Sequence, residues 1–391
     1  MIHTSGTDRR GFALAVAMMA IVVIGALIAG AFFASTQEFR IGRNTLVGQR
    51  AFAVAEYGLN KEISQWDRSR NLPGAMATGA VSSNHVYVAG DDTAYVTITK
   101  LNDNTFWVVS EGQASMGAAQ LRSRQRTNSI VRIAYPTINF QGAVTTAGNV
   151  DINGSARISG YDHSDSTSNL QAWSQCASIA DSNMAGIAIS PTATFQQRDS
   201  ARVYGYPAVN RTASATDSLT YVSYGSETWN TLTRNADIRI PGGTAVNPAP
   251  VGSDTTCTLG MGNWGEPNRG TGTIAGCYNY FPIVYYDGNL TIESNGRGQG
   301  VLLVNGDLRI RGNFEFYGVI IVRDDVERDN GTARIYGALM ARNANLGQGD
   351  GASTWTGNQS VMFSNCSVQS ALRGTAILVP VRQRGWAQLF N

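Results

Sequence analysis

The sequence predicts an α+β protein in which a long amino-terminal helix packs on a small antiparallel sheet and is followed by a mainly-β domain. Three observations predict it: an unbroken apolar run at residues 12–34, alternating apolar and polar residues between 85 and 134, and short apolar pairs bounded by glycine from 138 onward. Glycine is abundant, at 43 of 391 residues, and charged residues make up only 15%. This composition indicates β structure with many tight turns.

The apolar run that begins at Phe12 predicts a membrane-spanning helix. It contains no proline, and no charged residue lies between Arg10 and Glu38. At about 1.5 Å per residue the run reaches across a hydrocarbon core of about 30 Å, whereas a secretory signal has an apolar centre of only about 7–15 residues. Arg9 and Arg10 precede the run, which predicts that the amino terminus lies in the cytoplasm.

The loosely helical spacing of the next apolar residues predicts that the helix continues as an amphipathic rod to about Trp66. Asn71, Pro73 and Gly74 then end it. The alternating segments "HVYVAG", "AYVTITKL", "TFWVVSEGQAS" and "SIVRIAY" predict the strands of an antiparallel sheet, with "NDN" as a hairpin link. We expect this sheet to cover the apolar stripe of the rod.

Repeated motifs downstream of the sheet predict a right-handed parallel β-helix. "GNVDING", "SARISG", "DGNLTIES", "GDLRIRG", "NFEFYG" and "ARIYG" place apolar residues two apart and begin or end on glycine with Asn or Asp. This spacing suits very short strands joined by tight turns, with Phe314, Phe316 and residues 319–322 in the core. A sandwich with glycine turns is the alternative. Between Tyr161 and Tyr280 the motifs disappear, which predicts an irregular insert.

The predicted organisation is a leader at 1–11, a helical stem at 12–74 with its membrane span at 12–34, the antiparallel sheet at 75–136, the β-helix-like domain at 137–350 with its insert at 161–280, and a carboxy-terminal β or irregular segment at 351–391.

Four cysteines, Cys176, Cys257, Cys277 and Cys366, lie downstream of the span, where an even count in a translocated domain favours disulfides. Cys257 with Cys277 closes a loop of suitable length and leaves Cys176 with Cys366, but sequence alone leaves the connectivity open. No two cysteines form a CxxC pair and the three histidines are scattered. We therefore predict no metal site and no cofactor.

The sequence offers little to an enzyme hypothesis, since it lacks a GxSxG elbow, a P-loop and an HExxH pair. In "RDDVERD", Asp324, Asp325 and Glu327 are candidates for a polysaccharide-cleaving carboxylate cluster, although a charged turn facing water is the ordinary explanation. "NWGEP" sets Trp264 beside a carboxylate that could contact a sugar, but packing next to the disulfide is favoured. We predict that the chain is not an enzyme. Its net charge of +2, without an Arg-rich block, predicts no nucleic-acid partner.

The order of the amino-terminal elements resembles that of type IV pilin-like proteins. Arg9, Arg10 and Gly11 close a short polar leader, Phe12 opens the apolar helix, and "AFAVAEYGLN" lies in the amphipathic stretch. The resemblance covers residues 9–66 and is greatest to the large minor pilins of the PilX type. The β-repetitive remainder more loosely resembles the glycine-rich passenger regions attached to such stems in bacteria. The resemblance implies that a prepilin peptidase cuts between Gly11 and Phe12, and that Phe12 becomes the N-methylated first residue.

One position departs from the family pattern. Major pilins have Glu at the fifth mature position, where this sequence has Val16. In the family that carboxylate pairs with the terminal amine of a neighbouring subunit, in apolar surroundings where an unpaired charge is costly. Val16 cannot make this pair. The resemblance to Glu-lacking minor pilins and to the K-type pseudopilin of type II secretion implies a tip or assembly-priming position.

The resemblance implies a bacterial inner-membrane protein with a single span, its carboxy-terminal domain outside the cytoplasm, that later reaches a pilus or the cell surface. The implied partners are other pilin subunits along the helix, the prepilin peptidase, the inner-membrane assembly platform and, before assembly, membrane lipid. Three rivals stay open: a surface adhesin that binds a glycan through the solenoid or its insert, an anchored polysaccharide-degrading enzyme, and a plain bitopic protein that is never cleaved.

Overall fold

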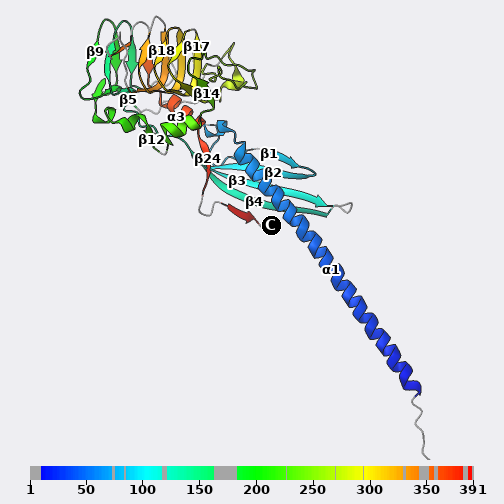
Figure 1. Ribbon diagram of the computed structural model, residues 1–391. Coiled ribbons are helices and arrows are strands. Elements are labelled where there is room, and N and C mark those ends of the chain that lie inside the picture. Colours follow the sequence, from blue (N-terminus) through cyan, green and yellow to red (C-terminus); the bar gives the residue numbers. More distant parts are fainter. Residues whose placement is uncertain are drawn as a thin grey trace, which may run out of the picture.

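The computed structural model describes residues 10–389 except 73–74, 83–84, 117–120, 163–182, 226, 269, 294, 329–331, 343–351, 356–359 and 382–385. A single helix, α1 (Arg10–Ser64), projects from the rest of the chain. An antiparallel sheet lies beside its second half, and a stack of short parallel strands lies beyond its end (Figure 1). The predicted α+β class, with a long apolar helix and a mainly-β domain, is confirmed.

The second half of α1 packs on a sheet whose first four strands run antiparallel in chain order. They are β1 (His85–Ala89), β2 (Asp92–Asn102), β3 (Thr105–Met116) and β4 (Leu121–Ala134). Buried and half-buried residues alternate along β2, as expected for a sheet with one covered face. Val47, Ala51, Val54 and Leu59 are buried on the helix side. Gly112 permits the close approach, because a Cβ there would lie 2.1 Å from the Ala51 carbonyl oxygen.

The carboxy-terminal strands return to this sheet. β24 (Ile377–Pro380) and β25 (Trp386–Leu389) both pair antiparallel with β4. Ile377 is the register partner of Ala134, so residues 135–376 leave and rejoin the sheet at neighbouring positions. The parallel stack is therefore inserted between two adjacent strands of the antiparallel sheet. The predicted terminal segment 351–391 is instead divided between stack and sheet, because pairing over such a separation leaves no local sequence signal.

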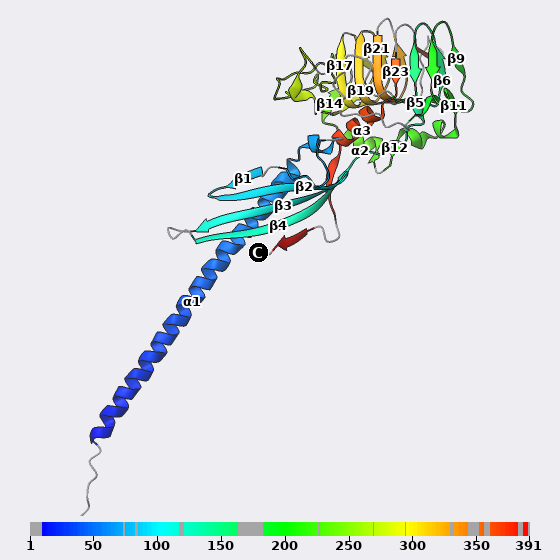
Figure 2. The ribbon, with the colours of Figure 1, turned by 180° about the vertical axis from the view of Figure 1, so that it is seen from behind.

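The inserted domain is a stack of rungs with three faces built from parallel strands (Figures 1 and 2). The strands are paired in register throughout, except that β20 and β22 on the second face are neighbours without a paired register. The first face contains, in spatial order, β14 (Ile238–Pro241), β15 (Ile283–Asp287), β17 (Gly296–Val304), β19 (Asn313–Val322), β21 (Thr332–Ala341), β5 (Gly142–Thr146), β8 (Ala185–Ile189) and β11 (Val209–Arg211). Ile283 pairs with Val301 and Val301 with Val319, so one rung takes 18 residues here.

The other two faces follow the same order of rungs. The second contains β16 (Leu290–Ile292), β18 (Leu308–Ile310), β20 (Val326–Arg328), β22 (Ala352–Trp355), β6 (Asn149–Ile152) and β9 (Phe195–Gln197). The third contains the first halves of β17, β19 and β21, then β23 (Ser360–Met362), β7 (Arg157–Ser159) and β10 (Arg202–Tyr204). The residues predicted as core, Phe314, Phe316 and 319–322, are all buried. Parallel pairing throughout does not fit the sandwich alternative, and the hand of the coil stays a prediction.

The stack does not follow the order of the chain. β21, late in the sequence, pairs with β5, the first strand after the antiparallel sheet. The chain thus begins in the middle of the stack, runs to one end at β11, crosses to the opposite end at β14 and works back to the middle. The prediction that residues 161–280 form an irregular insert is therefore wrong for part of this range. The strands β8 to β11 and β14 lie within it and form regular rungs of the stack. Short strands such as "FQQ" and "VNR" carry too few apolar residues to be recognised from sequence.

The crossing from β11 to β14 runs along one side of the stack (Figure 2). Its elements are η3 (Ala213–Ala215), η4 (Ser218–Tyr221), β12 (Ser223–Tyr224), β13 (Glu227–Thr228) and α2 (Trp229–Arg234). Tyr221, Tyr224, Trp229 and Leu232 are buried and belong to the core of the stack. The crossing therefore adds to the apolar packing of the domain.

Three glycines in register, Gly300, Gly318 and Gly337, bend β17, β19 and β21 at φ values of 107°, 132° and 144°. These conformations favour glycine, and at Gly318 the missing side chain also makes room for α3 (Asn365–Gly374). A Cβ at Gly318 would lie 2.1 Å from the Gly300 carbonyl oxygen and 2.9 Å from the Ala371 Cβ on α3. The missing side chain at Gly318 therefore lets α3 pack against these strands before the chain leaves the stack.

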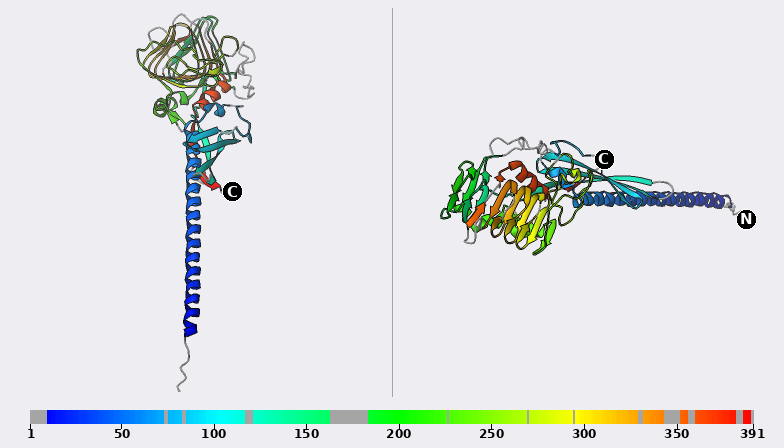
Figure 3. Two further views of the ribbon diagram at one scale, coloured as in Figure 1. Left: turned by 90° about the vertical axis from the view of Figure 1, so that its right-hand side faces the viewer. Right: turned by 90° about the horizontal axis from the view of Figure 1, so that it is seen from above.

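The stack and the end of α1 meet at η1 (Arg68–Asn71), shown from two further directions in Figure 3. Asn71 donates to the Arg373 carbonyl oxygen at 3.5 Å, and Arg68 pairs with Asp237 at 2.9 Å. Leu72 packs with Phe281 and Tyr317 of the stack in a small apolar cluster. These contacts join the inserted domain to the stem as well as to the sheet.

Candidate functional site

The first half of α1, residues 12–34, is a free apolar stem. Every residue in this range is exposed, with Phe12 at 77% and Val16 at 51%. The mean hydropathy of its most apolar 18-residue window is 2.8, and none of that window is buried. The helix is long and apolar enough to cross a membrane, because exposed apolar side chains over this length are stable in lipid and costly in water.

The predicted processing residues lie at the start of this stem. Gly11 and Phe12 are both within α1, and residues 1–9 of the predicted leader lie outside the described residues. Val16 faces outward one turn further along, in a stretch without a charged side chain. The structure therefore places an apolar side chain where a filament-forming carboxylate would be expected from the family resemblance. Cleavage and methylation stay predictions.

Glu62, near the end of α1, is a buried carboxylate that ties the helix to η1 and β1. It is 1% exposed. Its Oε1 accepts from Arg70 at 2.8 Å, and its Oε2 accepts from the Tyr87 hydroxyl and from His85 Nδ1, both at 2.6 Å. The cluster therefore holds three elements together where the stem meets the sheet.

The hydrogen bonds of this cluster assign the protonation of its members. Arg70 lies 2.9 Å from His85 Nε2, and since a guanidinium only donates, Nε2 accepts and Nδ1 carries the proton donated to Glu62. Burial alone would raise the pKa of Glu62, but hydrogen bonds from Tyr87, Arg70 and His85 outweigh it and hold this pKa below its ordinary value. Burial and the adjacent carboxylate raise the pKa of the Tyr87 phenol. The carboxylate is thus the charged centre of the joint.

This cluster was not predicted from the sequence. A signal for it exists, since Glu62 follows the buried Leu59 by three residues and so lies on the same face of the helix. A carboxylate on a core-facing stripe needs partners, because an unpaired buried charge is costly. The partners themselves come from separate segments and cannot be identified from spacing.

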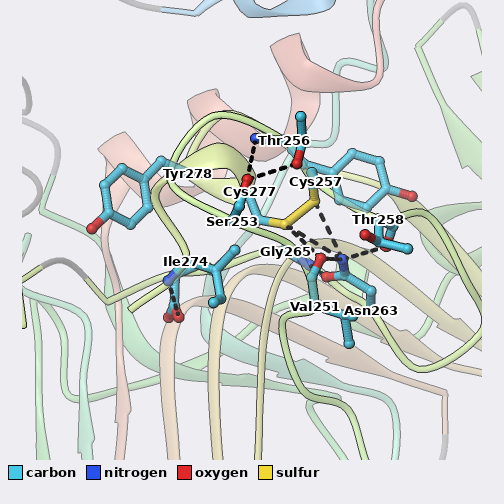
Figure 4. Close-up of a disulfide and its surroundings, with 12 residues drawn as sticks. Val251, Ser253, Thr256, Cys257, Thr258, Asn263, Gly265, Ile274, Cys277 and Tyr278 are labelled. Atoms are coloured by element: carbon cyan, nitrogen blue, oxygen red, sulfur yellow. Dashed lines mark hydrogen bonds between the residues drawn. A yellow bond between two sulfur atoms is a disulfide. The ribbon is translucent and has the colours of Figure 1, made fainter. Parts of the chain in front are cut away.

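The predicted disulfide between Cys257 and Cys277 is confirmed. Cys366 is also disulfide-bonded, and its predicted partner Cys176 lies outside the described residues. Asn263 holds the disulfide-closed loop from inside: it is 2% exposed, and its Nδ2 donates to the carbonyl oxygens of Val251 at 2.9 Å and Thr258 at 2.7 Å (Figure 4). The disulfide and this amide together order a loop that has little regular structure, with η5 (Ala275–Cys277) at its end.

Trp264 packs in the core of the stack, as predicted from the sequence. It is completely buried, its Nε1 donates to the Met261 carbonyl oxygen at 2.9 Å, and its ring meets Phe314 edge-on at 6.5 Å. The ring therefore fastens the disulfide-closed loop to the rungs and is not available to a ligand.

The acidic residues of the enzyme rival lie on a corner of the stack. The Asp325 backbone N–H donates to Asp307 Oδ1 at 3.0 Å, and the Asp307 N–H donates to Asn289 Oδ1 at 3.0 Å. Acceptors at this corner therefore cap the turns of successive rungs, which is a structural role. Asp324 is exposed, and the side chain of Glu327 lies outside the described residues. Among the described residues, no three His, Cys, Asp or Glu side chains gather as a metal site.

No protein-family model matches the chain, and no curated protein matches it. Among solved structures, the chain is similar to the competence-associated pilin ComZ from Thermus thermophilus, with 14% identity and a TM-score of 0.27, over 88% of this chain and 97% of that chain. A TM-score this low is no evidence of a shared fold or a shared function.

Proposed function

We propose that this chain is a non-enzymatic, minor pilin-like subunit of a type IV pilus or related pseudopilus, with a tip or assembly-priming position. Its stem is held in the bacterial inner membrane as a single span before assembly, with the β-rich domains outside the cytoplasm. The partners are membrane lipid, the prepilin peptidase, the assembly platform and then other pilin subunits along α1. At the end of the pathway the inserted domain is displayed on a pilus or the cell surface.

The free apolar stem is the observation that carries this proposal. A helix that only anchored a domain would need the span alone, whereas α1 continues without interruption from the span into the sheet. The Glu62 cluster locks that continuation. A rigid stem of this kind suits transfer from lipid into a helical bundle, because apolar side chains replace lipid contacts with contacts to neighbouring stems.

The position of the inserted domain relative to α1 and the sheet supports a tip position. The stack lies beyond the sheet, at the opposite end of the molecule from Phe12 (Figure 3). In a filament that grows by addition from the membrane side, that end of a shaft subunit is covered by earlier subunits. A domain formed by residues 135–376 has free space around it at the end of a filament. Val16 cannot form an ion pair with the terminal amine of a neighbouring subunit. This supports a position at which no neighbouring amine has to be neutralised.

The first test is the mass of the amino-terminal peptide of the protein purified from membranes, with and without its prepilin peptidase. We expect a peptide that begins at methylated Phe12 only when the peptidase is present. A peptide that still begins at Met1 in both preparations would refute the proposal and leave a simple anchored protein.

The tip position is tested by Val16→Glu and by immunogold labelling. We expect the natural protein at filament ends, and the substituted protein evenly along the shaft with piliation retained. Labelling of the natural protein along the whole shaft would refute the tip position while leaving the pilin-like pathway intact.

A further inference from the structure

The loop closed by the disulfide (residues 257–277), the chain just before it and the third face of the stack line a hollow of about 430 Å³, here called the flank groove. Polar side chains from three consecutive rungs line it, together with one amide from the loop: Asn295, Arg297, Asn313, Glu315, Arg334 and Asn268. Pro248 and Pro250, which precede the disulfide-closed loop in the chain, form its apolar wall. Neither the Glu62 cluster nor the acidic corner belongs to the groove.

The lining of the flank groove repeats with the rungs. Arg297, Glu315 and Arg334 are register partners on adjacent strands, and so form one row of charges across the stack. Asn313 donates to Asn295 Oδ1 at 2.9 Å in a parallel row. Adjacent strands lie about 4.8 Å apart, so the groove presents similar hydrogen-bonding groups at regular steps. Such a lining suits an extended ligand with repeating polar groups.

Buried acceptors hold these side chains in place. Arg297 donates to Glu266 at 2.7 Å, and Glu266 is completely buried, where it also accepts from the backbone N–H groups of Asn268 and Ile274. Asn268 in turn donates to Glu315 at 3.2 Å. A network anchored on a buried carboxylate restricts the side chains before a ligand arrives, which lowers the entropic cost of binding.

The charges of the flank groove balance. On the lining Arg297 and Arg334 carry positive charges and Glu315 a negative charge, and the completely buried Glu266 behind Arg297 supplies the second negative charge. Nucleic acid and other polyanions require a net positive surface, so they do not fit. A peptide bound by strand addition needs a free sheet edge. At the groove β19 and β21 are paired on both sides, and on the outer side of β17 the Arg297 and Gln299 N–H groups already donate to the carbonyl oxygens of Pro248 and Trp264. Helix-in-groove binding needs large exposed apolar side chains, and Phe314, the largest apolar side chain of the lining, is only 2% exposed.

We propose that the flank groove binds a neutral oligosaccharide. Sugar hydroxyl groups both donate and accept hydrogen bonds, which matches a lining of amides, guanidinium groups and a carboxylate whose charges sum to zero once the buried Glu266 is included. Pro248 and Pro250 offer apolar surface to the C–H faces of sugar rings. The groove belongs to the inserted domain, so this binding holds whether or not the stem enters a filament.

The test is binding of the full chain, kept in a detergent without sugar groups, to an array of neutral, uronic-acid-containing and sulfated oligosaccharides and of peptides. We expect binding to neutral glycans, weakened at least tenfold by Arg334→Ala and by Asn313→Ala. Arg157→Ala is the matched control, because Arg157 lies in the same row two strands beyond Arg334 and outside the groove. Its binding should equal that of the natural chain.

Circular dichroism melting of each variant shows whether the stack remains folded. Absence of binding to any neutral glycan, or preference for anionic glycans or peptides, would overturn the proposal. So would undiminished binding by folded Arg334→Ala and Asn313→Ala. Processing at Phe12 is measured separately, so a failure here is distinguishable from a failure of the pilin-like assignment.

Discussion

At the scale of single residues, Glu62 decides how firmly the stem joins the sheet. Replacing it by Gln removes the charge but keeps a side chain of similar size. We expect Glu62→Gln to lower the free energy of opening at the joint by about 2–3 kcal/mol, because Arg70, whose side chain is only 13% exposed, loses its charged partner. Hydrogen exchange of the β1 and β2 amides measures this. Glu56→Gln, half-exposed on the same helix, is the control and should change protection little.

The same carboxylate makes the joint sensitive to acid. The pKa of Glu62 lies below its ordinary value of 4.5 in the folded protein, so the unfolded state takes up a proton first as the pH falls. The stabilisation is therefore complete above about pH 4.5 and is lost as the pH falls through the lower folded value. We expect the difference between the natural chain and Glu62→Gln to shrink steadily below pH 4.5. A difference independent of pH between 3 and 7 would contradict this assignment.

Gly318 is the residue that most restricts the seat of α3. We expect Gly318→Ala to destabilise the stack by at least about 3 kcal/mol, because it combines an unfavourable φ with a collision against the Gly300 carbonyl and Ala371. Thermal unfolding of the full chain in detergent measures the loss. Gly243→Ala separates the two causes, since Gly243 also has a positive φ of 79° but open space around its Cα. Equal losses in both variants would show that packing against α3 contributes nothing.

At the scale of elements, the disulfide-closed loop depends on a covalent link because it has little regular structure. Cys257 and Cys277 are 20 residues apart, a loop for which a disulfide contributes about 3 kcal/mol. We expect the double Cys→Ser variant to lose hydrogen-exchange protection in the loop while β19 keeps its own. Loss of protection in β19 to the same degree would mean that the loop and the rungs unfold as one unit.

At the scale of the whole molecule, the insertion defines where the chain can be cut. Ala134 and Ile377 are register partners, so joining Pro136 to Ala376 through one glycine leaves a four-residue hairpin connection. We expect this excised chain to keep its membrane insertion and a folded sheet, measured by membrane fractionation and by hydrogen exchange of β2 and β3.

Deletion of 161–280 is the comparison, because it removes β8 to β11 and β14 and with them both ends of the stack. That variant should lose the protection of the stack. An excised chain that is degraded, or a 161–280 deletion that keeps a protected β19, would show that the insertion boundary is wrong.

The sequence by itself determined the elements whose signal is local. The apolar stem, the amphipathic continuation of α1, the alternating strands and the repeating rungs each follow from spacing within one segment, as does the order of motifs that predicts a pilin-like stem. The disulfide between Cys257 and Cys277 belongs to this group, because short separation makes it the nearest pairing.

Only the tertiary structure decided which distant segments meet. The pairing of Ile377 with Ala134, the joining of β21 to β5, the partners of Glu62 and the rows that line the flank groove all connect residues far apart in the chain. The backbone groups of a strand can form hydrogen bonds with any suitable neighbouring strand, and a buried charge can be paired by any suitable side chain. The spacing of residues in the sequence therefore does not specify which partner is used. Register and packing make that choice once the chain is folded.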